Sequence, residues 1–347
     1  MSPIVEETSR TDSGIAVISA CSTVIENEST RSLEEMLFDT STAALKAAGL
    51  TAEDIDGVVL SGNDQIDGRV ISIMASAGPT GGVNRDTTMT ASAGDHALAY
   101  GYLRLKAGQG KNVLVVGWAK PSESKDPDRA ELMSAEPYLL RQVGMNQTIA
   151  AALQSSVWVA QGVEKGSPDA TVWPLAKNDL PGRGDSVHAA VLAVDGAFPE
   201  GSELAWILDA GWATVSYEIG ARDLGDLASL RAALGQIAAR NPDAAPEHWD
   251  AVEIAGDSEQ AVRATVRMLD ISDNVEVNGS GSLSEQLTSP HVAGLGRMMA
   301  AIRSVGKSQS PNDSSAKARM TAGIGFNGFA GQGASVMVFS SSKGEVK

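Results

Sequence analysis

The chain has 347 residues, 43% of them hydrophobic, and a formal net charge of −16. This length predicts two domains or one duplicated domain. The negative charge argues against nucleic acid and anionic membranes as partners, because both need a basic protein surface. A single cysteine, Cys21, excludes an internal disulfide and a multi-cysteine metal site, which favours a reducing cytoplasm.

The N-terminal region and the apolar runs carry the sequence signals of targeting, where a protein has them. Residues 1–14 lack the basic and apolar blocks of a signal peptide, so we expect a flexible polar tail. Apolar runs stay shorter than the ~18 residues that a membrane-spanning helix needs. We therefore expect no membrane association.

The first part of the chain alternates apolar runs with stretches of helical apolar spacing. In chain order, these patterns predict a strand at 15–20, a helix at 32–49, strands at 57–60 and 86–90, a helix at 93–108 and a strand at 111–119. This alternation is typical of a mostly parallel sheet covered by helices.

The C-terminal part repeats this order. It predicts a strand at 204–215, a helix at 227–241, a strand region at 248–256, a helix at 291–306 and strands at 318–328 and 334–340. The repeat at a spacing of roughly 190 residues indicates an internal duplication. The alternative is a pair of unrelated α/β units with the same rhythm.

Between the two parts, the polar residues 120–129 predict a surface loop, 138–162 a long helix and 185–194 a strand. Residues 305–319 are polar and are expected to form an exposed loop.

Four stretches then suggest a known family. They are TAEDIDGVVLSG (51–62), DSVHAAVLAV (185–194), VNGSGSLSEQLTSPHVAGLGRMM (277–299) and NGFAGQGASVMVF (327–339). Their order and spacing resemble the thiolase superfamily, nearest to the sterol-carrier-protein type, from about residue 15 to 339. The resemblance implies a five-layered α/β/α/β/α fold with two duplicated halves. These would be 15–119 plus 185–195 and 196–347, separated by a shortened loop region at 120–184.

The resemblance also locates an active site whose residues have changed. The family's nucleophilic cysteine lies at a helix N-terminus, where backbone N–H groups and the helix dipole favour a thiolate. That position matches Ala91, which cannot attack a thioester. The neighbouring Ser92 is either a substitute nucleophile or a helix cap.

Three further family positions have no clear match. The catalytic histidine falls on Thr288 without gaps, or on His291 after a shift of three residues; His291 could equally be a cap or first-turn residue of the next helix. Asn327 occupies the position of the second cysteine, and Ala255 that of a histidine or asparagine. Gly331 and Gly333 preserve either a tight turn or the N–H donors of an oxyanion hole.

The remaining candidates have ordinary interpretations. We interpret Cys21 as a small buried hydrophobic residue. His96 could line the pocket, although a surface or partner-facing position is the primary expectation. The four histidines are widely spaced and accompany no cysteine pair, so we expect no metal site.

Several functions stay open at this stage. The first is a degenerate or scaffold subunit without conventional thiolase catalysis. It would form a homodimer through the edge strand 86–90, or a heteromer with a thiolase paralogue or a small OB-fold acyl-CoA-binding protein. The second is a retro-aldolase acting on a β-hydroxyacyl thioester, with His291, Asn327, Ser92 and His96 as candidates. The third is an acyltransferase with an unrecognised nucleophile. A coenzyme A thioester is the implied ligand, although the short loop region argues against coenzyme A binding.

Overall fold

The computed structural model describes residues 13–26, 29–64, 71–90, 93–163, 184–283, 289–305, 308–310, 313–317 and 319–344. The strands are β1 (Ile15–Glu26), β2 (Gly57–Ser61), β3 (Asp86–Thr90), β4 (Asn112–Ala119), β5 (Gly184–Val194), β6 (Ala205–Thr214), β7 (Ala251–Ala255), β8 (Glu276–Val277), β9 (Ser308–Ser310), β10 (Asp313–Lys317), β11 (Met320–Asn327) and β12 (Gly333–Ser340). The α-helices are α1 (Leu33–Ala47), α2 (Ser72–Ser76), α3 (Gly94–Lys106), α4 (Pro127–Met133), α5 (Gln147–Ala160), α6 (Ala228–Arg240), α7 (Glu259–Met268) and α8 (Pro290–Ser304).

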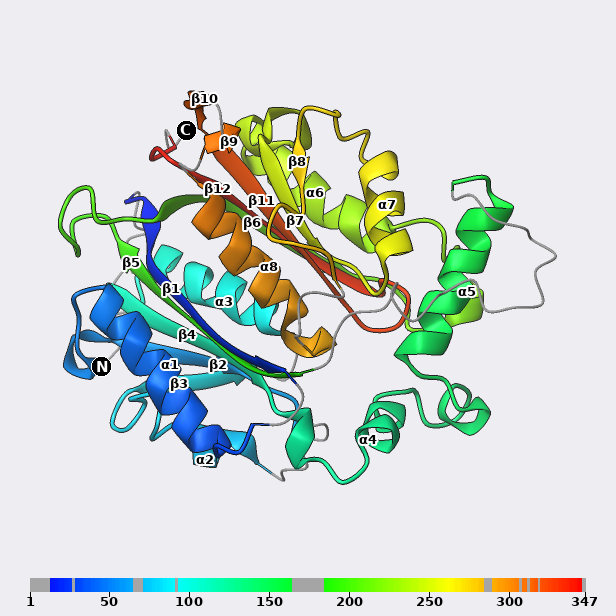
Figure 1. The fold of residues 1–347 in the computed structure, drawn as a ribbon, viewed down its shortest axis with the longest axis horizontal. Coiled ribbons are helices and arrows are strands. Elements are labelled where there is room, and N and C mark those ends of the chain that lie inside the picture. The colour runs from blue at the N-terminus through cyan, green and yellow to red at the C-terminus, as the bar shows by residue number, and fades with distance from the viewer. Residues whose placement is uncertain are drawn as a thin grey trace, which may run out of the picture.

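Ten strands form one sheet in the order β3-β2-β4-β5-β1-β6-β12-β11-β7-β8 (Figure 1). The central strands are β1 and β6. Counted outward from each of them, the sheet has two antiparallel strand pairings followed by two parallel ones. The two sides meet only where Ile15–Val17 pairs with Ala205–Ile207. The sheet is therefore mixed, which corrects the expectation of a mostly parallel one, and its pairing pattern repeats on each side.

Helices cover the outer face of each half of this sheet, and further helices fill the space between the two halves. On one side, α1 packs against β1, β4 and β5; on the other, α6 packs against β6 and β12. Between them, α3 and α8 contact each other and strands of both sides (Figure 1). Three separate apolar clusters match these interfaces. The predicted α/β/α/β/α layering is thus confirmed.

The predicted helix at 138–162 is wrong in its first part. Gly144 has a left-handed backbone with φ of 73°, which ends a short turn at Arg141–Val143. Asn146 then caps α5 by accepting a hydrogen bond from the Ile149 N–H at 2.9 Å. The helix consequently begins at Gln147.

The predicted exposed loop at 305–319 is also wrong. Residues 308–310 and 313–317 pair as the antiparallel strands β9 and β10, which form a separate two-stranded sheet. The first strand of the chain is longer than the predicted 15–20. Its polar continuation through Glu26 pairs in register with β5, so tertiary pairing extends it beyond the apolar run.

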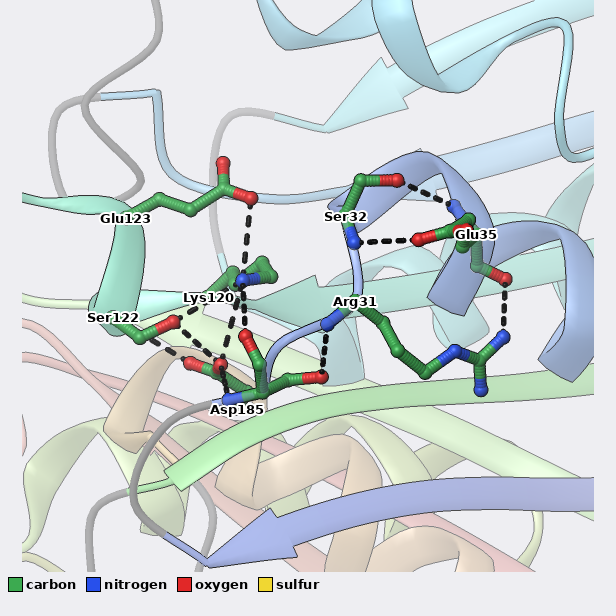
Figure 2. A network of polar contacts seen from close by, with 8 residues as sticks. Arg31, Ser32, Glu35, Lys120, Ser122, Glu123 and Asp185 are labelled. Atoms are coloured by element: carbon green, nitrogen blue, oxygen red, sulfur yellow. Dashed lines mark hydrogen bonds and ion pairs between the residues drawn. The ribbon is translucent and has the colours of Figure 1, made fainter.

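In the predicted surface loop at 120–129, the described side chains after Lys120 are exposed or half-buried, but Lys120 itself belongs to a buried polar network (Figure 2). Lys120 is only 3% exposed, and its Nζ lies 3.6 Å from the fully buried carboxylate of Asp185. Asp185 also accepts hydrogen bonds from the Ser29 N–H at 2.8 Å and from the Ser122 hydroxyl at 2.5 Å. Through these contacts, the start of β5 holds two other segments in place, the one before α1 and the one after β4.

Candidate functional site

The candidate site lies where β11 ends and the two middle helices begin. Asn327 is the last residue of β11, and His96 lies in the first turn of α3. The Asn327 Nδ2 and His96 Nε2 atoms are 3.1 Å apart, within hydrogen-bond distance. His96 is therefore half-buried and contacts a predicted site residue, which corrects the expectation of a surface histidine.

Contacts along α8 show how this helix runs over β11. A Cβ added to Gly323 would lie 2.7 Å from the Met298 side chain. One turn earlier in α8, a Cβ on Gly294 would meet the carboxylate of Asp95, which also faces Gly325. The helix therefore runs antiparallel to the strand, and one turn of helix covers about two strand residues. This direction carries the first turn of α8, which contains His291, toward the C-terminal end of β11.

Asp95 joins α3, α8 and β11 at the centre of this region. Its carboxylate is fully buried and accepts a hydrogen bond from the Ser335 hydroxyl of β12. Gly294 and Gly325 leave the space that it occupies, since a Cβ at either position would lie within 2.7 Å of a carboxylate oxygen. This close packing sets the position of His96, the next residue in α3.

The protonation state of His291 follows from its surroundings. Desolvation lowers the pKa of this imidazole to about 4. The ring is consequently neutral at pH 7, so one nitrogen donates and the other accepts a hydrogen bond. With such a low pKa, His291 can orient a ligand but is a weak general base near neutral pH.

The loop that follows β11 has a strained and well-anchored backbone. Ala330 and Gly331 have φ values of 50° and 64°. Their carbonyl oxygens accept hydrogen bonds from the Arg222 guanidinium at 2.8 Å and the Ser229 hydroxyl at 2.7 Å, respectively. In a trans peptide the next N–H points the opposite way, so the Gly331 N–H is directed away from Arg222. Gly331 therefore lies in a tight turn, whereas Gly333 begins β12 and pairs with Asn327 and Thr214.

Ala91, Ser92 and Thr288 lie outside the described residues. The flanking backbone is close-packed: a Cβ on Gly94, the first residue of α3, would lie 2.9 Å from the Leu295 Cβ of α8. Ala255, the last residue of β7, is buried and pairs with Gly325. The structure thus brings His96 and Asn327 into contact and leaves the cysteine position itself undescribed.

Cys21 lies on a different part of the fold, in β1, where it pairs with Ala189. It is partly buried and packs against the apolar cluster under α1, in line with a hydrophobic role. Burial raises the pKa of its thiol, which lowers its reactivity at neutral pH. Across the described ranges, no group of three or more His, Cys, Asp or Glu side chains is placed to hold a metal ion. Nor do these ranges contain a helix long and apolar enough to cross a bilayer.

Neither a protein-family model nor a curated protein matches this sequence. Solved structures do match this chain in their fold. Two crystal structures of human mitochondrial 3-ketoacyl-CoA thiolase, one of them in complex with CoA, superpose with a TM-score of 0.67. They are 16% and 15% identical, and the match covers 95% of this chain and 99% of each thiolase chain.

The chain has the thiolase fold. Few residues are identical, but the superposition extends over nearly the full length of both chains. The strand order and the middle helices therefore belong to one shared architecture. Sequence reasoning located Asn327 and His291 through motifs of that fold. It did not anticipate the buried Asp95, whose signal was a charged residue on an otherwise apolar helix face.

Proposed function

We propose that this thiolase-fold protein acts in acyl-CoA or ketide metabolism without Cys-dependent acyl transfer. The observation that carries the proposal is the contact between Asn327 and His96. An amide at the position expected for the second cysteine can hold an imidazole or a ligand oxygen, but it cannot serve as a thiolate base. The single thiol, Cys21, lies in β1 with a raised pKa, which adds support.

The first role that we propose is that of a degenerate or scaffold subunit that works with a partner. Apolar side chains beside the edge strand β3 support an interface there: Met74 is 79% exposed and Val83 is 59% exposed. The partner would be a second copy, a thiolase paralogue or a small OB-fold acyl-CoA-binding protein. This role is independent of any chemistry in the chain itself.

Co-expression with an active thiolase paralogue, or with a small OB-fold acyl-CoA-binding protein, tests this role. We expect a complex of fixed stoichiometry by size-exclusion chromatography with light scattering. In a heteromer, the paralogue carrying its cysteine should show higher thiolase activity than it does alone. A homogeneous homodimer that by itself cleaves a β-hydroxyacyl thioester would contradict the scaffold role.

The second role is a retro-aldolase acting on a β-hydroxyacyl thioester, and the contact between His96 and Asn327, together with the direction of the His291 end of α8 toward β11, supports it. A neutral imidazole and an amide can both donate hydrogen bonds to a thioester oxygen, as an enolate forming on the substrate requires. Incubation with 3-hydroxyacyl-CoA should then release an aldehyde and a shortened acyl-CoA. Asn327→Ala should lower this rate by about a hundredfold to a thousandfold, which is the usual cost of losing one oxyanion donor.

Covalent labelling distinguishes both roles from an acyltransferase with an unrecognised nucleophile. After incubation with radiolabelled acyl-CoA and removal of free label, we expect no stable label on the protein. Label located by mass spectrometry on Ser92 or Cys21 would overturn the proposal. Ser92→Ala and Cys21→Ala provide the matched controls for each site.

A further inference from the structure

Asp257 follows β7 at the same edge of the sheet as Asn327. β7 and β11 are parallel, and Ala255 pairs with Gly325 as the last pair of their ladder. Asp257 and Asn327 each lie two residues beyond that pair. Because neighbouring strands lie ~4.8 Å apart, their Cα atoms leave the sheet within about 10 Å of each other. This edge, outside the carboxyl ends of parallel strands, is where α/β sheets bind ligands.

The alternation of side chains along β7 places residues 251, 253 and 255 on the face that α8 covers. Glu253 points to this face, since its carboxylate accepts a hydrogen bond from the buried Arg297 of α8 at 2.8 Å. On β11, Gly323 and Gly325 occupy the same face, under Met298 and Asp95. Asp257 and Asn327 therefore both follow strand residues of this face, at the end of the sheet toward which the N-terminus of α8 is directed.

The segment between the two halves also reaches this position. The Gln147 side chain, in the first turn of α5, lies close enough to Asp257 to lower the pKa of its carboxyl group. The backbone N–H of Gln147 donates to Glu131 of α4 at 3.0 Å. Asp257 is thus half-buried beneath the start of α5. Desolvation raises the pKa of Asp257 to about 6, with Glu131 as a secondary cause, so this carboxyl group exchanges protons close to neutral pH.

We propose that Asp257 belongs to the same site as His96, His291 and Asn327, and that its carboxylate binds the β-hydroxyl group of a β-hydroxyacyl thioester. This inference rests on the proposed retro-aldolase role and supplies the base that His291 cannot provide. It also assigns the α4–α5 segment a function, since Gln147 lies close to the Asp257 carboxylate.

The chemical step balances without any co-reactant. Asp257 takes the hydroxyl proton, and the O–H electron pair forms the new carbonyl bond. The bond between the α and β carbons breaks, and its electrons move into the thioester enolate, which His96, His291 and Asn327 can stabilise by hydrogen bonds. The protonated Asp257 then returns the proton to the α carbon. The products are an aldehyde or ketone and a shortened acyl thioester.

Binding of two non-cleavable ligands tests the assignment separately from catalysis. S-(3-hydroxybutyl)-CoA and S-butyl-CoA lack the thioester carbonyl, so neither can form an enolate, and they differ only in the hydroxyl group. By isothermal titration calorimetry at pH 7.5, the wild-type protein should bind the hydroxyl ligand about tenfold more tightly or better, as expected for a hydrogen bond to a carboxylate. Asp257→Ala should abolish this ratio, whereas the exposed control Asp273→Ala should keep it.

Turnover provides the second measurement. Asp257→Asn keeps a polar side chain of the same size beside Gln147 but cannot take a proton, so kcat for 3-hydroxyacyl-CoA should fall about a hundredfold or more while KM changes little. A wild-type protein that binds both ligands equally, or an Asp257→Ala variant that keeps the ratio, would overturn the assignment and leave thioester binding intact. A wild-type protein that binds neither ligand would overturn the assignment and the thioester-binding function together.

Discussion

At the scale of single residues, His188 shows how burial couples this fold to pH. The imidazole is 2% exposed, and its Nδ1 lies 2.8 Å from the Ser22 hydroxyl across the β1–β5 pair. Desolvation lowers the pKa of His188 from 6.5 to about 4, and the Arg303 guanidinium acts in the same direction. The unfolded chain therefore binds a proton at this histidine more readily than the folded chain does.

This difference predicts a loss of stability in acid. Between pH 6.5 and pH 4 the unfolded state is protonated at His188 and the native state is not, so the free energy of unfolding falls as the pH is lowered. Between pH 7 and pH 4.5 the contribution of this one group amounts to about 2 kcal/mol. Urea unfolding at both pH values should show this difference between the wild-type protein and His188→Gln. His248→Gln, at an exposed position, should show none.

A pair of glycines offers a second test at this scale. A Cβ on Gly325 would lie 2.4 Å from an Asp95 carboxylate oxygen and 3.0 Å from the Ser335 hydroxyl, and both of these side chains are fully buried. Gly325→Ala should therefore cost about 1–3 kcal/mol through overpacking. Gly235 lies exposed in the interior of α6, with nothing within 4 Å of an added Cβ. Gly235→Ala should instead stabilise by about 0.5–1 kcal/mol. Equal effects in urea unfolding would contradict the close packing around Asp95.

Sequence reasoning reached some of these residues and missed others for a physical reason. Asn327 and His291 fall in motifs whose order along the chain is visible in the sequence. The contact between His96 and Asn327 joins residues 231 positions apart. Such a contact depends on how α3 and α8 pack, and no local pattern encodes it. The same holds for Asp257, which is brought to the site by the register of β7 and β11.

At the scale of elements, Asp185 connects three segments through one buried carboxylate. The Ser29 N–H and the Ser122 N–H and hydroxyl donate hydrogen bonds to this carboxylate, and the Lys120 ammonium forms an ion pair with it (Figure 2). Asp185→Ala would remove one counter-charge of the buried Lys120, whose Nζ also lies 3.2 Å from Glu123, and would leave the Ser29 and Ser122 donors without this acceptor, so we expect a loss of about 1–3 kcal/mol in the free energy of unfolding. Asp195→Ala removes the exposed pair with Lys343 and should cost about 1 kcal/mol or less. Comparable losses in the two variants would contradict a central role for the network.

Elements with a strong local pattern could be predicted from the sequence, and those set by tertiary pairing could not. The spacing of apolar residues in α1 and the capping box at Ser32 define that helix almost to the residue. The short strand β8 and the hairpin β9–β10 carry little apolar signal, since they form by pairing with other segments. Lys120 shows the same limit, because a buried ion pair requires its distant partner Asp185.

At the scale of the whole molecule, the repeat of pairing patterns leaves β3 and β8 at the two ends of the described sheet. The two ends differ in length, since β3 has five residues and β8 only two. A five-residue edge strand with exposed backbone groups is a template for pairing with another strand. The apolar residues Met74 and Val83 near this edge add area that association would bury.

These features predict a symmetric dimer through β3. Sedimentation velocity over a range of concentrations should show a dimer at micromolar protein. Thr88→Lys places like charges opposite each other across a two-fold axis, so the dimer Kd should rise about tenfold or more. Ser341→Lys, beyond the end of β12 at the centre of the sheet, should leave the Kd unchanged. A wild-type monomer, or a Thr88→Lys variant that dimerises as tightly as the wild-type protein, would exclude β3 as the interface and direct the search for a partner to other surfaces.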